Sequence, residues 1–248
     1  IVCSVYHIDF ENFDKKEKDD FYERDKYVDF YHVISLKTKQ QLEKLTKKKI
    51  ISIPFWVNQD IWFPIENKQG LRSDFNLNKE DYLVGSFQRD TEGSDMISPK
   101  LIKGPDIFLD IVEKIYDTNK NLKVILSGKR RNYLIKNFQN KNIPYKYFEM
   151  VSLETLNKLY NILDLYIVSS RIEGGPQAIL ECSISKTPIV STDVGVASEI
   201  LHPNSIFKQE NFFEASPNVD FAYKSSQKYK IPYGMKEFIK MFSDNYVN

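Results

Sequence analysis

Short apolar runs alternate along this chain with longer runs of helical period. Strands are predicted at residues 1–6, 31–36, 50–54, 82–87, 122–127, 145–149, 163–169 and 188–192. Helices are predicted between them, at residues 14–25, 37–47, 105–117, 131–140, 153–161 and 176–186. Such alternation is typical of α/β proteins, in which the strands pair in parallel. The pattern therefore predicts an α/β fold.

Strands in the second half of the chain are largely apolar along their whole length, as in residues 122–126 and 165–168. This is typical of a parallel sheet that helices cover on both faces. The helix predicted at 105–117 begins with a proline and places its apolar residues along one stripe, as a helix packed on a sheet does. These features predict a doubly wound, Rossmann-like domain.

Two segments depart from the alternation. Residues 55–80 show no sustained period, and we interpret them as a connection between domains. Residues 209–246 are predicted to be further helix, broken near Pro232 and Gly234, because these residue types interrupt helices.

Composition narrows the class of protein. Apolar residues make up 42% and charged residues 28% of the chain, which is the range of folded proteins. Lys and Arg number 35 against 34 Asp and Glu, so no overall positive charge would attract nucleic acid. No apolar run approaches the roughly 18 residues that a membrane-spanning helix needs.

The two cysteines, Cys3 and Cys182, lie far apart and lack the spacing of a disulfide framework or a zinc site. A cytoplasmic location is therefore expected. The chain begins with Ile1 directly on a strand-like run, and we expect that further sequence precedes it.

The most informative stretch is SSRIEGGPQAILE, from Ser169 to Glu181. It leaves a buried strand, turns at Gly174 and Gly175, and enters a helix through Pro176. A helix N-terminus at the carboxyl end of a parallel sheet suits a phosphate or diphosphate. The carboxylate five residues beyond the proline is about 7.5 Å further along a helix axis, a plausible distance from a diphosphate to its ribose.

This stretch resembles the donor-binding motif of family 4 retaining glycosyltransferases, which have the two-domain GT-B architecture. In that family seven residues separate two glutamates, as they separate Glu173 and Glu181 here. The resemblance implies that Glu173 contacts the transferred sugar and Glu181 holds the ribose of a UDP- or GDP-sugar. It also places the glycines, proline and helix start beside the donor, at Gly174, Gly175, Pro176 and Gln177. Two surface carboxylates around a helix start are the alternative.

The resemblance continues upstream. Arg89, at the end of a strand, and Lys103, before the next helix, resemble the family's basic pair that neutralises the donor diphosphate. Such a pair stabilises charge on the leaving group electrostatically, so no metal or other cofactor is expected. Residues 90–102 form an insertion that is long for the family, and either a lid or a displaced Arg89 is consistent with it. As an alternative, both cations are solvated surface residues.

The same resemblance assigns further positions. It implies that the nucleotide base lies near Gly128, Met150 and Val151. His7 resembles a strand-end histidine that points into the cleft near the transferred sugar, where an imidazole can bind the sugar or manage protons. A structural role for His7 is the alternative. Arg130 and Arg131 are interpreted either as phosphate contacts or as exposed charges.

The family architecture implies three parts. Residues 1–54 would be a remnant of an N-terminal acceptor-side domain, 55–230 a C-terminal nucleotide-sugar-binding domain, and 231–248 a helix that returns to the first domain. The implied reaction transfers a sugar, with retention of configuration, from a nucleoside diphosphate sugar to a glycan or lipid-linked acceptor. Cell-surface glycan or glycolipid synthesis, at the inner face of a membrane with peripheral association, is the family-level expectation. A nucleotide-sugar-binding module without transferase activity and a GT-B epimerase stay open as alternatives.

Overall fold

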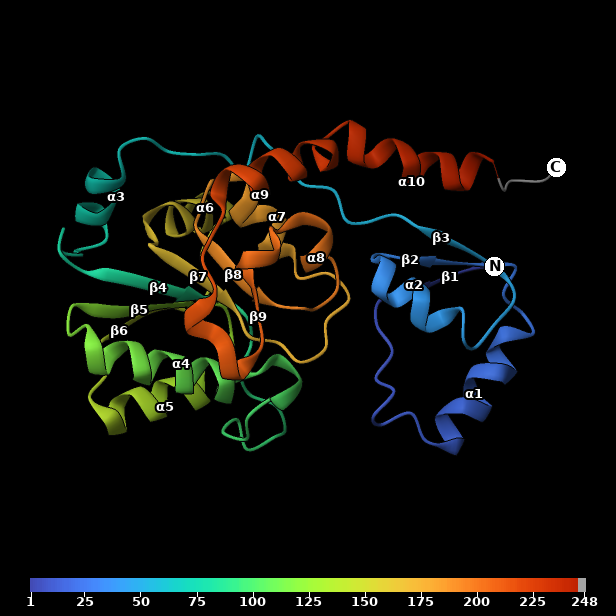
Figure 1. The fold of residues 1–248 in the computed structure, drawn as a ribbon, viewed down its shortest axis with the longest axis horizontal. Coiled ribbons are helices and arrows are strands. Elements are labelled where there is room, and N and C mark those ends of the chain that lie inside the picture. Colours follow the sequence, from blue (N-terminus) through green and yellow to red (C-terminus); the bar gives the residue numbers. More distant parts are fainter. Residues whose placement is uncertain (245–248) are drawn as a thin grey trace.

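The computed structural model describes residues 1–244 and contains two parallel sheets (Figure 1). The first has the order β1-β2-β3 and the second the order β6-β5-β4-β7-β8-β9. The strands are β1 (Val2–Val5), β2 (Phe30–Val33), β3 (Lys49–Ser52), β4 (Tyr82–Ser86), β5 (Leu122–Ser127), β6 (Tyr145–Phe148), β7 (Leu165–Val168), β8 (Ile189–Thr192) and β9 (Ile206–Phe207). The predicted α/β fold is confirmed, and β9 is a strand that the sequence pattern did not indicate.

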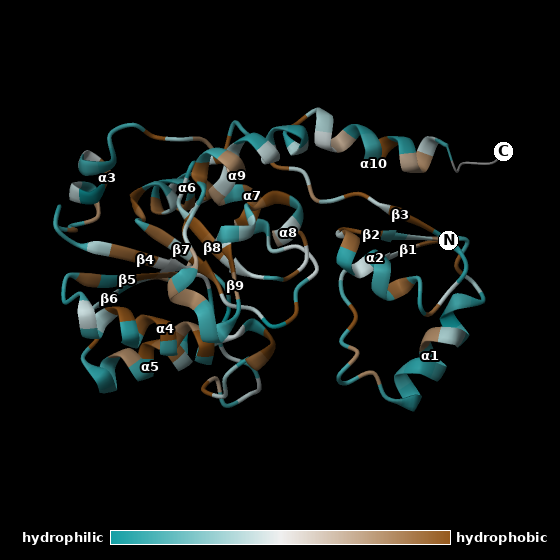
Figure 2. Cartoon of the chain, in the orientation of Figure 1, coloured by the Kyte–Doolittle hydropathy of each residue, from teal (hydrophilic) through white to brown (hydrophobic). Residues whose placement is uncertain are grey.

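Helices cover both faces of the six-stranded sheet, with α4 and α5 on one face and α6 and α7 on the other (Figure 1). The helices are α1 (Lys15–Asp25), α2 (Leu36–Leu42), α3 (Lys68–Asp74), α4 (Pro105–Thr118), α5 (Asn132–Lys141), α6 (Leu153–Ile162), α7 (Gln177–Ile184), α8 (Ala197–Ile200), α9 (Val219–Ser226) and α10 (Tyr233–Ser243). Figure 2 shows the strands of this sheet as apolar segments between helices with polar outer faces. The sheet is doubly wound, as predicted.

Helix α4 shows how the local sequence produces this packing. It begins after Gly104, which has the left-handed φ of 62°, and Pro105 occupies its first turn. Its apolar stripe is buried against the sheet, and Phe108 and Val112 are completely inaccessible. Complete burial of one such side chain contributes about 1.5–3 kcal/mol to stability.

Helix α2 ends earlier than the predicted 37–47, at Leu42. The chain then tightens into shorter turns, in which Lys44 N donates to Gln41 O and Leu45 N donates to Leu42 O. It turns to enter β3 instead of extending the helix.

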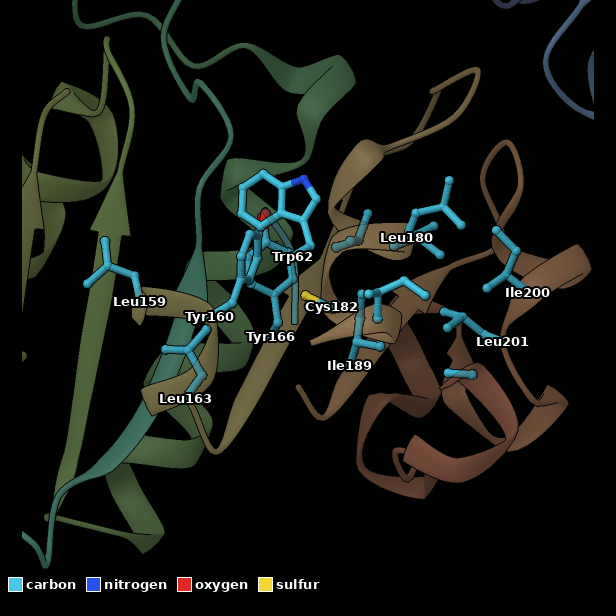
Figure 3. Close-up of a cluster of buried hydrophobic side chains, with 14 of the residues drawn as sticks. Trp62, Leu159, Tyr160, Leu163, Tyr166, Leu180, Cys182, Ile189, Ile200 and Leu201 are labelled. Atoms are coloured by element: carbon cyan, nitrogen blue, oxygen red, sulfur yellow. The ribbon is translucent and has the colours of Figure 1, made fainter. Parts of the chain in front are cut away.

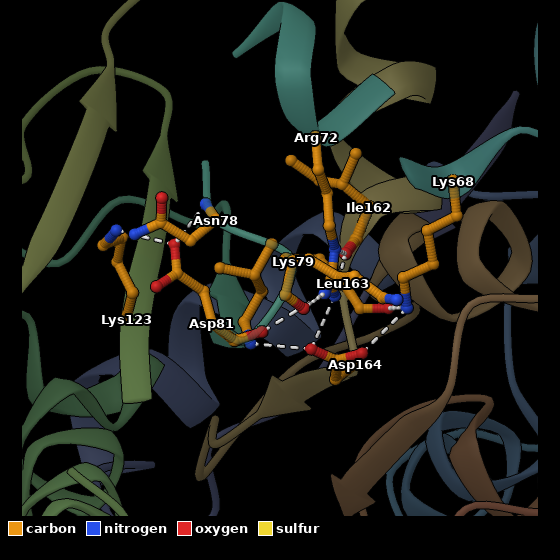
Figure 4. A network of polar contacts seen from close by, with 10 residues as sticks. Lys68, Arg72, Asn78, Lys79, Asp81, Lys123, Ile162, Leu163 and Asp164 are labelled. Carbon is orange, nitrogen blue, oxygen red and sulfur yellow. Dashed lines mark hydrogen bonds and ion pairs between the residues drawn. The ribbon is translucent and has the colours of Figure 1, made fainter. Parts of the chain in front are cut away.

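Residues 55–80, the predicted connection between domains, contain helix α3, which the sequence pattern did not indicate. Arg72 in this helix is 4% exposed and donates to the carbonyl oxygen of Ile162 and to Asp164 Oδ2, the latter over 2.6 Å. Lys68 donates to the other oxygen of Asp164 at 2.9 Å (Figure 4). Buried polar contacts therefore hold this helix in place. Its apolar face is too short to produce a helical period in the sequence.

The C-terminal segment is broken between α9 and α10, at residues 227–232. The predicted break near Pro232 agrees with this, whereas Gly234 lies inside the first turn of α10. Residues 245 and 246 of the predicted segment 209–246, and residues 245–248 of the predicted returning helix 231–248, lie outside the described residues. Phe238 and Met241 of α10 pack in a cluster with Phe30 of the first sheet, and Figure 1 shows α10 running from the larger sheet towards the smaller one. The domain division at residues 54 and 230 stays a prediction.

Candidate functional site

The stretch from Ser169 to Glu181 crosses the carboxyl end of the six-stranded sheet. Adjacent strands β4 and β7 lie at its centre, where the order of strands along the chain reverses. In open α/β sheets, ligands bind outside such a switch point. Ser169 and Ser170 are completely buried there, and α7 begins at Gln177, one residue later than predicted.

A pocket of about 350 Å³ opens at this switch point. Its lining consists of Phe87, Gln88, Leu156, Tyr160, Tyr166, Val168, Glu173, Gly175, Pro176, Gln177, Ala178 and Glu181. The fold thus brings both glutamates of the motif, one of its glycines and its helix start to the same hollow.

Glu181 reaches the pocket from the second turn of α7. Tyr160 Oη donates to Glu181 Oε2 at 2.7 Å. The surrounding side chains include the rings of Tyr160 and Tyr166, which belong to the buried cluster in Figure 3. Burial raises the pKa of Glu181 to about 7, although the hydrogen bond from Tyr160 works in the opposite direction. Within residues 1–244 the carboxylate has no other side-chain partner, so it has capacity to accept from a ligand.

Glu173 lies at the other side of the pocket and forms an ion pair with Lys103. Its carboxylate is largely covered, with the side chain 14% exposed. Ser170 Oγ lies 3.2 Å from Glu173 Oε1 and 3.1 Å from Gln88 Oε1, and Gln88 Nε2 donates to Lys103 O at 2.8 Å. Residues from two connections, β4 to α4 and β7 to α7, are therefore held in one polar cluster around Glu173.

The two motif glycines have different surroundings. A Cβ on Gly174 would lie 2.0 Å from the carbonyl oxygen of Tyr6, in the segment after β1. A Cβ on Gly195, where φ is +51°, would lie 2.2 Å from the carbonyl oxygen of Gly174. Glycine at position 174 therefore allows the loop after β7 to pack closely against the segment after β1. Gly175 instead lines the pocket.

A second hollow, of about 220 Å³, lies between the N-terminal segment and the motif. Its lining includes His7, Lys37, Arg171, Glu173 and Gly195. Glu173 lines both hollows, and the exposed His7 is brought to the same side as this carboxylate. A group bound in one hollow would meet a group bound in the other at Glu173.

The two predicted cations are placed differently. Lys103 is paired with Glu173 and partly buried, at 27% exposure. Arg89 is exposed, and within the described residues it forms neither a hydrogen bond nor an ion pair. Neither residue lines the larger pocket, but both lie close enough to Lys100 to affect its pKa.

Arg131 is a correction to both sequence interpretations, the phosphate contact and the exposed charge. It is completely buried and its Nε donates to Asp90 Oδ2 at 3.1 Å. The guanidinium also donates to the carbonyl oxygen of Gln88. An arginine enclosed in this way is structural. Its neighbour Arg130 has a left-handed φ of 60° and is partly exposed.

The predicted base-binding residues are not brought to the pocket. Gly128 follows β5 with a φ of +88°, and Met150 is 68% exposed. Val151 packs against the hydrophobic cluster on the α6 and α7 face. Gly128, Met150 and Val151 are all absent from the lining of both hollows described above.

Sequence reasoning missed several residues that the pocket uses. Tyr160 donates to Glu181, Gln88 donates to the backbone of Lys103, and Phe87 and Leu156 form apolar walls. Leu156 and Tyr160 are four residues apart on α6, so they share a helix face. The spacing of Leu156 and Tyr160 on α6, together with Tyr166 on the next strand, is the sequence signal that could have identified this side of the pocket.

Comparison with known proteins bears on this site. The model of the family "Glycosyl transferases group 1" matches residues 97–230, which is more than half of the chain. The chain belongs to this family. The matched region includes the whole motif from Ser169 to Glu181 and Lys103.

Two curated relatives of this group 1 chain are each 25% identical to it. One is alpha-galactosylglucosyldiacylglycerol synthase of Streptococcus pneumoniae, matched over 64% of this chain and 42% of the relative. The other is a probable sucrose-phosphate synthase of Thermosipho melanesiensis, matched over 87% of this chain and 48% of the relative. The chain thus spans about half the length of these relatives.

Solved structures show the fold. Sucrose-phosphate synthase from Thermosynechococcus elongatus aligns with a TM-score of 0.79 at 13% identity, over 98% of this chain and 67% of that one. Anabaena HepE, solved in complex with UDP and glucose, aligns with a TM-score of 0.77 at 13% identity, over 98% of this chain and 71% of that one. The architecture of the group 1 chain is therefore of the GT-B type. Within residues 1–244 no helix has the length and apolar character needed to cross a membrane.

Proposed function

We propose that this group 1 chain binds a nucleoside diphosphate sugar and transfers its sugar to an acceptor with retention of configuration, as a family 4 enzyme. One observation carries the proposal. Glu173 and Glu181 lie in one pocket at the switch point of a parallel sheet, beside the start of α7. Surface carboxylates with the same sequence spacing would have no reason to share a partly enclosed pocket.

Each residue has a role in this proposal. Glu181 accepts from the ribose hydroxyls, and Glu173 accepts from hydroxyls of the transferred sugar. Gly175, Pro176 and Gln177 border the phosphates at the start of α7, where the helix dipole favours negative charge. Arg89 and Lys103 neutralise the leaving diphosphate, and no metal is needed. The base lies towards Gly128, Met150 and Val151, beyond the pocket.

The reaction proceeds on one face of the sugar. The bond between the anomeric carbon and the diphosphate oxygen breaks, the acceptor oxygen bonds to the same carbon, and its proton passes to the departing diphosphate. His7 and Glu173 line the hollow where the acceptor would approach. Cations near the leaving group lower the barrier because negative charge grows there in the transition state.

Donor binding is tested by calorimetric titration of UDP and GDP into the unaltered chain and Glu181→Ala. Each hydrogen bond to a charged group is worth about 1.5–3 kcal/mol, so the variant should bind the preferred diphosphate roughly 10–100-fold more weakly. Glu154→Ala, at an exposed position on α6, is the matched control and should bind normally. Equal affinity in Glu181→Ala and the unaltered chain would remove the ribose role.

The acceptor belongs to the same proposal, as a glycan or lipid-linked molecule used in cell-surface glycan or glycolipid synthesis at the cytoplasmic face of a membrane. The glycolipid named for the Streptococcus relative supports this class of acceptor. Turnover of a UDP- or GDP-sugar with a panel of such acceptors, in the presence of EDTA, is the expected result. Donor binding without turnover of any acceptor would favour a binding module, and donor loss without acceptor would favour an epimerase.

A further inference from the structure

Residues 90–102, the insertion between Arg89 and Lys103, form a hairpin that closes on itself. Thr91 and Pro99 make an antiparallel bridge, and Glu92 N donates to Ser98 O at 3.0 Å. At the base of the hairpin, Lys100 N donates to Asp90 O at 2.8 Å. The two ends of the insertion are therefore held side by side.

A buried ion pair fixes the base of this hairpin. Asp90 is 1% exposed, and its carboxylate accepts from Arg131 Nε at 3.1 Å and from Tyr133 N at 3.2 Å. The backbone amides of Asp90 and Thr91 both donate to Arg130 O, at 3.1 and 3.2 Å. A buried charge pair offsets the cost of its desolvation only when its hydrogen bonds are well formed. The pair therefore favours a single position of the hairpin base.

The returning arm of the hairpin is attached to the motif. Ile102 O accepts from Arg171 N at 2.9 Å, and Leu101 O accepts from Arg171 Nη1 at 2.8 Å. Lys103 N donates to Lys100 O at 2.8 Å. Lys100 is therefore held between the buried base of the hairpin and the loop that carries Glu173.

Three cations gather at this point. Lys100 is partly buried and lies within electrostatic range of two cations, Arg89 and Lys103, and of two carboxylates, Glu92 and Glu173. Burial lowers its pKa, and the charges of Arg89 and Lys103 lower it further. Within residues 1–244 the Lys103 ammonium is paired with Glu173, whereas that of Lys100 has no ion-pair partner. A site with an excess of cations at this edge of the sheet is suited to a polyanion.

We propose that Lys100 is a third cation of the donor site and that the insertion serves to hold it against the terminal phosphate of the nucleoside diphosphate. The inference rests on the proposed function, since it concerns the same ligand. It goes beyond that function in one respect: Lys100, in addition to the predicted pair Arg89 and Lys103, is expected to make the site prefer a diphosphate over a monophosphate. The buried Asp90–Arg131 pair is, in this view, the support that positions Lys100.

The test compares nucleoside diphosphates with monophosphates in calorimetric titrations of UDP, UMP, GDP and GMP. Lys100→Gln should weaken binding of the preferred diphosphate about tenfold, the size of one lost charge-assisted contact, and should change monophosphate affinity by less than about twofold. Lys100→Arg keeps the charge and should restore most of the affinity. Lys136→Gln, which removes an exposed lysine on α5, is the matched control.

The outcomes separate the two proposals. Diphosphate affinity of Lys100→Gln within about twofold of the unaltered chain, together with a loss of tenfold or more in Lys103→Gln, overturns the role of Lys100 and leaves donor binding standing. An equal loss for diphosphate and monophosphate also overturns it, because it indicates a general structural change. Failure of the unaltered chain to bind either diphosphate overturns both.

Discussion

Glu181 combines a charged group with an apolar environment, because its carboxylate lies beside the rings of Tyr160 and Tyr166 in a buried cluster. Burial raises its pKa to about 7 from an ordinary value of 4.5. Between these two values the folded chain holds a proton that the unfolded chain has released. Stability must therefore fall as the pH rises through this range, and the loss is complete above the folded pKa.

We predict that Glu181→Gln removes this pH dependence. At pH 5 the variant and the unaltered chain should be similarly stable, and at pH 8 the variant should be more stable by up to about 3 kcal/mol. Urea unfolding at both pH values measures the difference. Glu80→Gln, at an exposed position, is the control and should leave the dependence intact. If the variant is no more stable than the unaltered chain at pH 8, burial of the ionised Glu181 carboxylate does not destabilise the fold.

Individual residues also show which features a single sequence displays and which it does not. The motif glutamates were predicted as a pair because their spacing, glycines and proline are local features of the chain. Arg131 was misinterpreted because its partner Asp90 lies 41 residues away and is brought to it only by the packing of β4 beside β5. The contact between Gln88 and Ser170 depends on tertiary structure in the same way.

At the scale of elements, the start of α4 controls the position of Lys103. A Cβ on Gly104, where φ is +62°, would lie 1.8 Å from the carbonyl oxygen of Ser169. We predict that Gly104→Ala destabilises the chain by about 3 kcal/mol or more, because backbone strain and a clash with backbone act together. Thermal or urea unfolding measures the effect.

Gly93 supplies the matched control for that substitution. It also has a positive φ, of +73°, but the nearest atom to an added Cβ lies 3.4 Å away on the Asp95 side chain. Gly93→Ala should therefore lower the free energy of unfolding by only about 1–2 kcal/mol, the energy needed to place alanine in the left-handed conformation. Equal effects of the two substitutions would mean that close approach to Ser169 is not what selects glycine at position 104.

Helix α3 depends on polar contacts. Burial opposes ionisation of Asp164, but hydrogen bonds from Leu83, Lys68 and Arg72 outweigh it and lower the pKa. We predict that Arg72→Met destabilises the chain by about 3–5 kcal/mol, since it leaves a partly buried carboxylate without its closest partner. Lys120→Met removes a surface ion pair with Asp117 and should change stability by less than about 1 kcal/mol. Similar values for both variants in urea unfolding would show that the α3 network is not a stabilising feature.

The elements themselves were predicted unevenly. Long, periodic helices such as α4 and continuous apolar strands such as β5 were indicated correctly, because burial on one stripe or on both faces leaves a sequence pattern. The seven-residue α3 and the two-residue β9 are too short to show a period. They form because tertiary contacts hold them, which a single sequence does not display.

At the scale of the whole molecule, the two sheets meet at the candidate site and through α10. Leu36 N, at the start of α2, donates to Glu199 Oε1 at 2.8 Å, and Lys37 forms an ion pair with Asp193 at 3.3 Å. The close contact of Tyr6 with Gly174 lies on the same side of the molecule. The hollow lined by His7 and Glu173 therefore exists only while the sheets keep this arrangement.

Phe238 of α10 joins this helix to the first sheet. Its ring lies 5.3 Å from that of His32 in β2 and 5.5 Å from that of Trp56. We predict that Phe238→Ala costs about 2–4 kcal/mol, because it removes a partly buried aromatic ring from this contact. Hydrogen exchange should then rise in β1 to β3 while β4, β5 and β7 stay protected, since local opening need not reach the larger sheet. Ile239→Ala, on the same helix at a residue 60% exposed, should leave both regions unchanged. Uniform loss of protection across both sheets would instead show that the chain opens as one cooperative unit, with α10 contributing no separate link between its two parts.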